Sequence, residues 1–393
     1  MTASLTWTRL FTQLGRFSRS CDNLTLQATP VHNVPTTRTK LSFPQWITLQ
    51  LIDACNLRCK MCYEWGEAGS YHGRKSTLLK LEVVKKLIAD CAPARPYYAL
   101  FGGEPMAYPW LADVVAAIRS SGSRVDMPTN GTFLAKKAEM LCEAPLNRIW
   151  VSLDGPREVN DDQRGLGVFD SVQNGVQVLF DLRQKRGQTE PKIGYTFIVT
   201  PRTHKYVQTF AEECIDFQKI DHLSIEFQTF IPEETYIRHR DFFRKAFGVQ
   251  DTPCAKGLVA KLEDFSQMDY HEIARQIRWV RQRCEEHGVY FVCYPKTVDP
   301  DNYKAYFEKR IEDLIDRRDR CMFPWIYLEV ASNGDATPCH TFYDYPIGNV
   351  NETPVLDIWR GARLGNMRDA LRTHGLFPAC SACARYYADP SKH

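Results

Sequence analysis

The sequence has no marked excess of charge of either sign, because 50 lysines and arginines oppose 47 aspartates and glutamates and leave a formal net charge of +3. Surfaces that bind nucleic acid need a strong basic excess, so this composition excludes that class of partner. The chain also lacks a run of about 18 apolar residues that could span a bilayer. Its N-terminus lacks the apolar run and cleavage site of a secretory signal. We therefore expect a cytoplasmic protein.

Cysteine, in contrast, is plentiful, with 14 residues in a chain of 393. A reducing compartment keeps thiols open, so a framework of disulfide bonds is not expected. Metal binding or redox chemistry is the better explanation for so many thiols. The spacing of the cysteines then indicates which of them act together.

Strand-like and helical patterns alternate along residues 45–230. The expected strands are residues 46–51, 97–101, 124–127, 148–153, 192–199 and 222–227. The expected helices are residues 78–91, 109–120, 133–142, 169–186 and 203–219. Strict alternation of this kind predicts parallel βα units with right-handed crossovers. The fold class is therefore α/β, with a partial (β/α)6 barrel that resembles an incomplete TIM barrel.

Three further segments accompany this core of residues 45–230. Residues 1–44 form an N-terminal extension, in which a basic and apolar stripe over residues 5–19 predicts a helix. That helix either docks on the core or makes weak contact with a membrane surface. Residues 231–320 are expected to be a helical connector, and residues 321–393 a small α+β module. Within the connector, we expect helices near residues 234–247, 269–287 and 302–318 and a short strand near residues 289–295.

The most informative motif is the CX3CX2C spacing of Cys55, Cys59 and Cys62, in the loop after the first expected strand. A structural zinc site normally has four nitrogen or sulfur ligands, so three cysteines leave it one ligand short. Three thiolates on a [4Fe–4S] cubane leave one iron open for an exchangeable ligand. The loops at the carboxyl ends of barrel strands are also where active sites lie.

This loop resembles the signature of the radical S-adenosylmethionine (SAM) superfamily. The resemblance implies that the amino and carboxylate groups of SAM bind the open iron. It also implies that one electron from the cluster cleaves SAM to a 5′-deoxyadenosyl radical, which abstracts a hydrogen atom from a substrate. The alternatives are an incomplete zinc site or three unrelated cysteines.

Further motifs of the same family follow the next strands in order. Gly102-Gly103-Glu104-Pro105 resembles the GGEP motif, in which glycines allow close approach of the backbone to SAM and the glutamate pairs with its ammonium group. The other implied SAM contacts are Met61, Asn130, Ser152, Asp154 and Arg164. In the family, Met61 is often replaced by an aromatic residue or histidine that contacts adenine; a thioether also packs on a purine. Taken singly, each motif is also compatible with an ordinary turn.

A second group of cysteines lies near the C-terminus, at Cys321, Cys339, Cys380 and Cys383. With Gly334, Gly348 and Trp359 nearby, this segment resembles the SPASM and twitch modules of radical SAM proteins. The resemblance implies an auxiliary [4Fe–4S] cluster whose four irons all have thiolate ligands, so that it transfers electrons and does not bind substrate. A structural zinc site with four cysteines is the alternative.

Other candidate functional residues come from the middle of the chain. Cys254 lies in an expected loop and is a candidate catalytic thiol whose pKa Lys256 could lower; a buried packing role is the alternative. Glu226 and Gln228 share one face of the last expected core strand. They contact substrate if that face lines the barrel, and solvent if it does not.

We expect an enzyme that abstracts hydrogen from a small molecule such as a sugar, a lipid or an amino-acid-like metabolite. The family also implies an external reductant, a flavodoxin or a ferredoxin. One alternative is a maturase for a ribosomal peptide or protein, although only 44 residues are available before the barrel for peptide recognition. A non-catalytic iron–sulfur electron carrier is a further alternative, and the GGEP-like motif argues against it.

Overall fold

The computed structural model describes residues 42–317, 320–341 and 343–383. The expected helix at residues 5–19, with its possible membrane contact, lies outside these residues. All of the described residues belong to one compact unit. The expected boundaries at residues 44, 230 and 320 therefore stay predictions.

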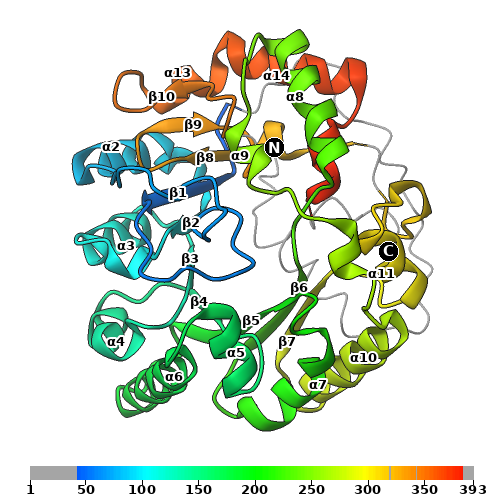
Figure 1. The fold of residues 1–393 in the computed structure, drawn as a ribbon. Coiled ribbons are helices and arrows are strands. Elements are labelled where there is room, and N and C mark those ends of the chain that lie inside the picture. Colours follow the sequence, from blue (N-terminus) through cyan, green and yellow to red (C-terminus); the bar gives the residue numbers. More distant parts are fainter. Residues whose placement is uncertain (1–41, 318–319, 342, 384–393) are drawn as a thin grey trace, which may run out of the picture. The chain divides into compact units, whose positions relative to one another are not determined.

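One mixed sheet organises the chain, with the strand order β10-β9-β8-β1-β2-β3-β4-β5-β6-β7 (Figure 1). Its strands are β1 (Trp46–Ile52), β2 (Tyr97–Gly102), β3 (Val125–Thr129), β4 (Arg148–Ser152), β5 (Lys192–Val199), β6 (His222–Phe227), β7 (Tyr290–Tyr294), β8 (Tyr327–Val330), β9 (Asp335–Thr337) and β10 (Gly348–Asn349). Along this order, every neighbouring pair in the stretch that begins at β8, continues with β1 and ends at β7 is parallel. Strand β9 pairs antiparallel with β8, and β10 pairs antiparallel with β9. The expected partial barrel is confirmed. Strand β7, predicted as a short strand of the connector near residues 289–295, and β8 add one parallel strand at each side of the six core strands.

The main helices are α2 (Leu81–Cys91), α3 (Leu111–Ser120), α4 (Leu134–Glu143), α5 (Arg157–Arg164), α6 (Val168–Lys185), α8 (Glu233–Phe247), α10 (Tyr270–Glu286), α11 (Pro300–Phe307), α13 (Val355–Arg360) and α14 (Ala362–His374). The shorter helical segments are η2 (Ala92–Ala94), η3 (Pro105–Ala107), η4 (His204–Tyr206), α7 (Val207–Thr209), η5 (Phe210–Cys214), α9 (Pro253–Lys256), η6 (Leu262–Phe265), η7 (Ile311–Asp313), α12 (Phe323–Ile326) and η8 (Pro378–Ala382). Helix α5 was not predicted, and it carries Arg164.

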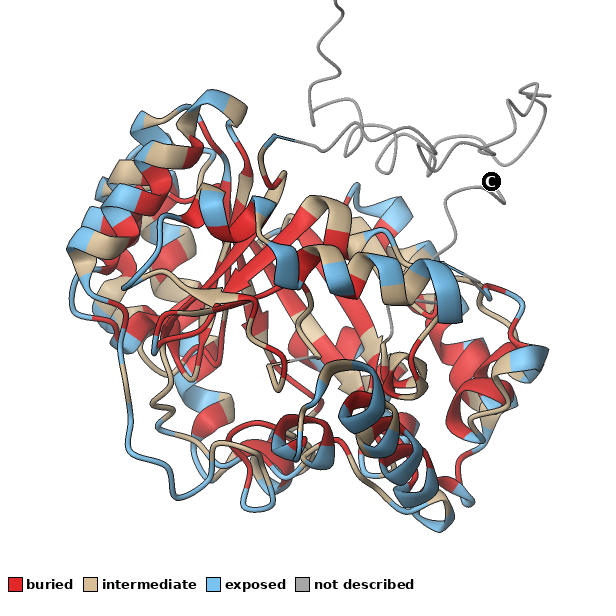
Figure 2. Cartoon of the chain, turned by 90° about the horizontal axis from the view of Figure 1, so that it is seen from above, coloured by how far each residue is buried: buried red, intermediate tan, exposed pale blue. Residues whose placement is uncertain are grey.

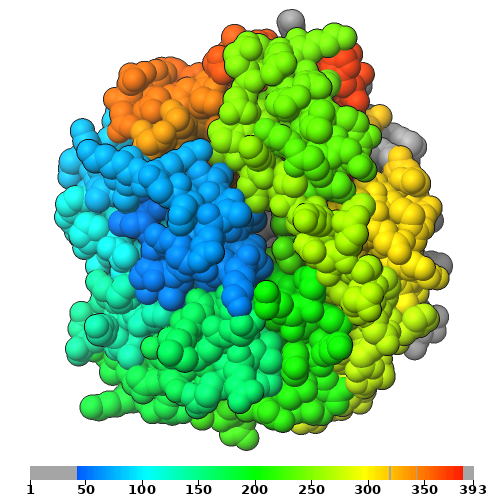
Figure 3. All heavy atoms as spheres, in the orientation of Figure 1, coloured from blue at the N-terminus to red at the C-terminus, as the bar shows by residue number. Residues whose placement is uncertain are grey.

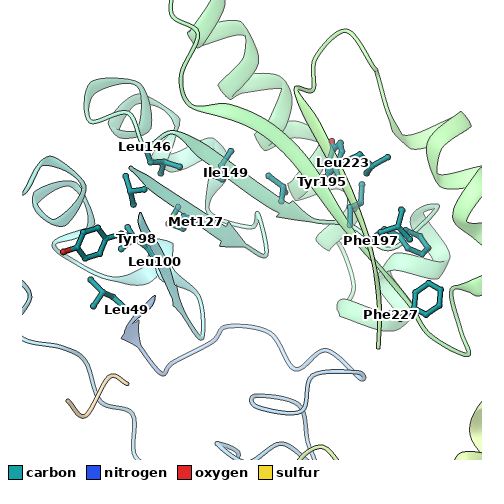
Figure 4. Close-up of a cluster of buried hydrophobic side chains, with 14 of the residues drawn as sticks. Leu49, Tyr98, Leu100, Met127, Leu146, Ile149, Tyr195, Phe197, Leu223 and Phe227 are labelled. Carbon is teal, nitrogen blue, oxygen red and sulfur yellow. The ribbon is translucent and has the colours of Figure 1, made fainter. Parts of the chain in front are cut away.

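The core lies between the sheet and the helices that connect its strands. In α2, for example, Val84, Leu87, Ile88 and Cys91 recur at helical spacing and are buried. Side chains from successive strands form one continuous apolar layer, part of which Figure 4 shows. Burial is concentrated on the strands and on the inner faces of the helices (Figure 2). This layer fixes the strands, and thereby the loops at their carboxyl ends.

The connector differs from the prediction at its end. Helix α11 stops at Phe307, whereas the pattern predicted a helix to residue 318. Lys309 has a φ of 56°, and the backbone N–H of Arg310 bonds to the carbonyl of Ala305. A left-handed residue ends an α-helix, so the chain turns here into the short segment η7.

Candidate functional site

The loop that follows β1 carries Cys55, Cys59 and Cys62. Backbone amides point at two of the sulfur atoms, since Leu57 N lies 3.4 Å from Cys55 Sγ and Trp65 N lies 3.2 Å from Cys62 Sγ. Burial is the main cause that raises the pKa of Cys55 and of Cys62, and the charge of Cys59 adds a smaller effect at both. The three thiols therefore lie within electrostatic reach of one another.

These thiols fit a cluster better than they fit a free nucleophile. Burial raises the pKa of all three, that of Cys62 to about 11, because a thiolate loses solvation inside the protein. The N–H donors oppose this effect at Cys55 and Cys62. Bound iron would deprotonate such thiols and take the thiolates as ligands. The loop thus offers three sulfur ligands that are already oriented by its own backbone.

Gly102 and Gly103 bring the end of β2 against the start of this loop. A Cβ atom on Gly102 would lie 2.2 Å from the carbonyl oxygen of Ile52, and one on Gly103 would lie 2.2 Å from that of Ala54. Gly102 also has a φ of +128°. Only glycine fits this approach without a shift of the backbone. The glycines therefore set the position of the cysteine loop itself.

Glu104, in the turn after β2, forms hydrogen bonds with residues at the end of β3. The side chain is fully buried; Oε1 accepts hydrogen bonds from Met106 N at 3.0 Å and Thr129 Oγ1 at 2.7 Å. Oε2 accepts one from Asn130 N at 2.8 Å. Burial raises the pKa of Glu104, and its charge raises that of Cys55. A carboxylate has about four acceptor positions, so one of them stays available for a ligand's ammonium group.

Asn130 carries the link from β3 back to the cysteine loop. Its Nδ2 donates to Asn56 Oδ1 at 2.9 Å and lies 3.9 Å from Cys55 Sγ. Its Oδ1 accepts hydrogen bonds from Thr132 N and Oγ1. The turn after β3 is therefore bonded directly to the first loop.

Asp154 and Arg164 form a buried pair behind Cys59. Arg164 Nε lies 2.7 Å from Asp154 Oδ2, and the carbonyl oxygen of Arg164 lies 3.9 Å from Cys59 Sγ. Asp154 also accepts hydrogen bonds from Gln163 Nε2 and Ile198 N, both at 2.7 Å. Asp154 has no exposed surface, so its charge is directed to Arg164, and the ion pair orients the Arg164 side chain. Its direct contact with SAM stays a prediction.

The predicted SAM contacts thus converge on one edge of the sheet, at the carboxyl ends of β1 to β4. Met61 and Ser152 are half-buried at this edge. In Figure 3 the surface is hollowed where residues around 55–75, in blue, meet the green segments. That each of these side chains touches SAM stays a prediction.

The four C-terminal cysteines also come together. Burial raises the pKa of Cys380, and the charges of Cys321, Cys339 and Cys383 raise it further. Burial likewise raises the pKa of Cys339, followed by the charges of Cys321 and Cys383. Cys339 follows β9, whereas Cys380 lies in η8, so the fold and not local spacing assembles this group.

A structural zinc site is the alternative to a cluster at these four cysteines. Four thiolates can bind one zinc ion, each about 2.3 Å from it. In a cubane each thiolate binds a different iron. Four thiols that the fold brings together suit either arrangement, so the ligand assignment of the auxiliary cluster stays a prediction.

Cys254, Glu226 and Gln228 lie in different surroundings. Cys254 is buried at 8% exposure, and burial together with the charge of Asp344 raises its pKa, the opposite of the expected effect of Lys256. Glu226 lies at the end of β6 and accepts a hydrogen bond from Ser224 Oγ at 3.1 Å. The carbonyl of Gln228 accepts one from Tyr306. A catalytic or substrate role for these three residues stays a prediction, and the surroundings of Cys254 disfavour one.

Sequence reasoning missed a polar network beside both cysteine groups, in which Gln50, Glu64 and Glu329 are buried and the other two members are partly exposed. Its members are Gln50, Glu64, Glu329, His340 and Tyr343. Glu64 is two residues after Cys62 and His340 directly follows Cys339. Burial raises the pKa of Glu64 to about 8. Adjacency to the cysteines was the only signal in the sequence.

Comparison with known proteins agrees with this geometry. The family model of the radical SAM superfamily matches residues 49–189, and that of the SPASM iron–sulfur cluster-binding domain matches residues 321–384. The chain belongs to the radical SAM superfamily. It is an enzyme that uses SAM, a [4Fe–4S] cluster, an auxiliary cluster, a reductant and a substrate.

Relatives of this radical SAM protein align along most of its length. Fe-coproporphyrin III synthase of Methanosarcina barkeri is 25% identical, over 84% of this chain and 78% of its own. Pre-heme d1 synthase of Dinoroseobacter shibae is 23% identical, over 84% of this chain and 76% of its own.

Solved structures share the fold. Streptococcus suis SuiB bound to S-adenosylmethionine superposes with a TM-score of 0.59 at 15% identity, over 89% of this chain and 77% of SuiB. SuiB bound to precursor peptide SuiA has a TM-score of 0.58 at 16% identity, over 98% of this chain and 87% of SuiB. Within the described part of the chain, no helix combines the length and apolarity needed to cross a bilayer.

Proposed function

We propose that Cys55, Cys59 and Cys62 hold the [4Fe–4S] cluster that binds SAM. The observation that carries this proposal is a loop with three thiols, two of them facing backbone N–H donors. When bound, this cluster and SAM supply the electron and the 5′-deoxyadenosyl radical for hydrogen abstraction.

The surrounding residues orient the cofactor and exclude water. Glu104 offers its remaining acceptor position to the ammonium group of SAM, and Arg164 offers its guanidinium to the carboxylate. Asp154 keeps Arg164 in place through the buried ion pair. The remaining proposed contacts are Met61, Gly102, Gly103, Asn130 and Ser152.

For the auxiliary cluster, we propose the ligands Cys321, Cys339, Cys380 and Cys383. Four thiolates occupy all four irons, so the cluster has no position for substrate. Its role is then to accept the electron that a substrate radical loses on oxidation. A flavodoxin or a ferredoxin is the proposed donor to the first cluster.

The proposed substrate is a small molecule. The support is that both relatives aligned over 84% of this chain are named for the synthesis of small molecules, an iron coproporphyrin and a pre-heme. A peptide maturase is the second candidate, because SuiB with its bound precursor peptide shares the fold over 98% of this chain. The electron-carrier alternative is wrong, since the family assignment makes the chain an enzyme.

Anaerobic reconstitution with iron and sulfide tests the ligand assignment. We expect about eight irons per chain, because two cubanes hold four each, and 5′-deoxyadenosine after reduction with SAM present. About four irons together with zinc would contradict the auxiliary cluster and leave the catalytic one intact. Failure to form 5′-deoxyadenosine with a loaded first cluster would contradict the proposed catalytic site.

Substrate class needs a separate measurement. In a screen of deuterium-labelled sugars, lipids and tetrapyrroles, we expect one compound to transfer its deuterium to 5′-deoxyadenosine. Capture of a precursor peptide by the purified holoenzyme, followed by modification of that peptide, would favour the maturase.

A further inference from the structure

Two aromatic rings, one from each of two cysteine-containing loops, are in contact, and each belongs to the residue directly after a cysteine. Tyr63 follows Cys62 in the first cysteine loop (residues 53–66), and His340 follows Cys339 in the Cys339 loop (residues 338–341 and 343–345). The Tyr63 and His340 rings meet edge to face, with centroids 6.4 Å apart. His340 also meets Phe101 of β2, with centroids 4.9 Å apart. The Cys339 loop thus packs on the part of the chain that positions the first cluster.

Glu329 of β8 holds His340 in this position. Both of its carboxylate oxygens lie 3.0 Å from His340 Nδ1. It also accepts hydrogen bonds from the hydroxyls of Tyr343, in the Cys339 loop, and of Tyr327, on β8 itself. Gln50 Nε2 of β1 donates to it at 3.3 Å. One carboxylate therefore joins the Cys339 loop to the strand that leads into the first cysteine loop.

The surroundings of Glu329 suit this role. The side chain has no exposed surface, so its acceptor positions depend on donors from the protein. Burial alone would raise the pKa of Glu329, but His340, Tyr327 and Tyr343 hold it below its usual value. Strand pairing places Glu329 opposite Thr48, next to Gln50 along the same face of β1. In Figure 1 β8 lies directly beside β1.

We propose that Glu329 is a positioning residue that couples the two loops, so that order in the Cys339 loop maintains order in the first cysteine loop. The inference rests on the proposed function, in which these loops hold the two clusters. A buried acceptor shared by donors from both sides favours one arrangement of both loops, because loss of any donor leaves a polar group unpaired.

Hydrogen–deuterium exchange on the reconstituted holoenzyme tests this coupling. Tyr343→Phe removes a hydroxyl through which the Cys339 loop bonds both Glu329 and Gln50 of β1, and leaves the contact of His340 with Glu329 in place. Tyr327→Phe is the matched control, because it removes a hydroxyl from the same carboxylate but lies on β8. We expect Tyr343→Phe and Glu329→Gln to speed exchange of the amides of Cys62, Trp65 and Gly66 by about tenfold, and Tyr327→Phe to leave them unchanged.

The EPR signal of the reduced first cluster gives a readout that a merely structural role would not move. In Tyr343→Phe, the SAM concentration that half-completes the spectral change should rise by about threefold or more, and in Tyr327→Phe it should not rise. Faster exchange confined to residues 335–345 would overturn the proposal, as would equal effects of the two tyrosine variants. If Glu329→Gln does not fold, Tyr343→Phe decides by the same criteria. An iron count below that of two clusters would contradict the ligand assignment, whereas exchange reports on the coupling itself.

Discussion

Asp154 and Arg164 form an ion pair that is closed off from water, with Nε 2.7 Å from Oδ2 and side-chain exposures of 0% and 6%. Asp154→Asn keeps the shape of the side chain and removes its charge. Breaking a buried pair by losing one partner costs about 3–5 kcal/mol, because the other charge stays buried. We expect the free energy of unfolding to fall by about 3 kcal/mol. The dissociation constant of SAM, measured by calorimetry, should rise by about tenfold.

Asp162→Asn provides the control for that experiment. Asp162 lies on the same helix, α5, but is 51% exposed and pairs with Lys60 and Arg202 at the surface. Exposed pairs contribute less than about 1 kcal/mol, so stability and SAM binding should change little. Equal losses in Asp154→Asn and Asp162→Asn would contradict a specific role for the buried pair.

Cys62→Ala should remove one cluster and leave the other. Only the first cysteine loop loses a ligand, so the iron content of the reconstituted protein should fall by about half, and 5′-deoxyadenosine formation should be lost. Cys91→Ala is the matched control, because Cys91 is a fully buried cysteine at the end of α2 and is not among the proposed iron ligands. Full loss of activity in Cys91→Ala with its iron intact would argue against this division of the cysteines.

Gly103→Ala should disturb the first cysteine loop through its backbone. The added Cβ would lie 2.2 Å from the carbonyl oxygen of Ala54 and 2.6 Å from the amide nitrogen of Cys55, so the loop has to move. We expect weaker SAM binding and reduced loading of the first cluster. In Gly365→Ala the new methyl group, in helix α14, meets no atom within 4 Å apart from its chain neighbours and the backbone of its own helix. That variant should gain up to about 1 kcal/mol of stability and keep full iron loading.

The cysteine motif and the strand-end turns could be predicted from the sequence, because the residues of each motif lie close together in the chain. Cys55, Cys59 and Cys62 lie within one loop, and the turns after β2 and β4 follow strands whose burial alternates along the chain. Parallel strands place their carboxyl ends at one edge, so the convergence of Glu104 and Asn130 on the cysteine loop followed from the fold class.

Contacts that depend on pairing between strands far apart in the chain could not be predicted from the sequence. Nothing in the sequence indicates that β8 pairs with β1, and this pairing brings Glu329 to Gln50 and His340 to Tyr63. The burial of Asp154 was missed for a similar reason, because it depends on the unpredicted helix α5, which supplies Gln163 and Arg164. Single polar residues carry no periodic signal, so only the folded chain assigns them partners.

Asp126 of β3 should make stability depend on pH in an unusual direction. It is 4% exposed, and its Oδ1 has no hydrogen-bond partner. Burial raises its pKa to about 6, although Arg148 opposes the shift. The folded state therefore holds a proton that the unfolded chain, with an aspartate pKa of about 3.9, has already lost. Between these two values, stability from this group falls as pH rises, by about 3 kcal/mol in all.

Asp126→Asn removes that loss, because an amide does not titrate. The variant should match the wild type near pH 4 and exceed it by about 2–3 kcal/mol at pH 7. Urea unfolding at several pH values between these limits measures the difference, and Asp113→Asn, at an exposed position of α3, serves as the control. If the difference between Asp126→Asn and wild type stays constant across this range, Asp126 does not take up a proton on folding. Arg148 would then keep Asp126 charged in the folded protein, against the effect of burial.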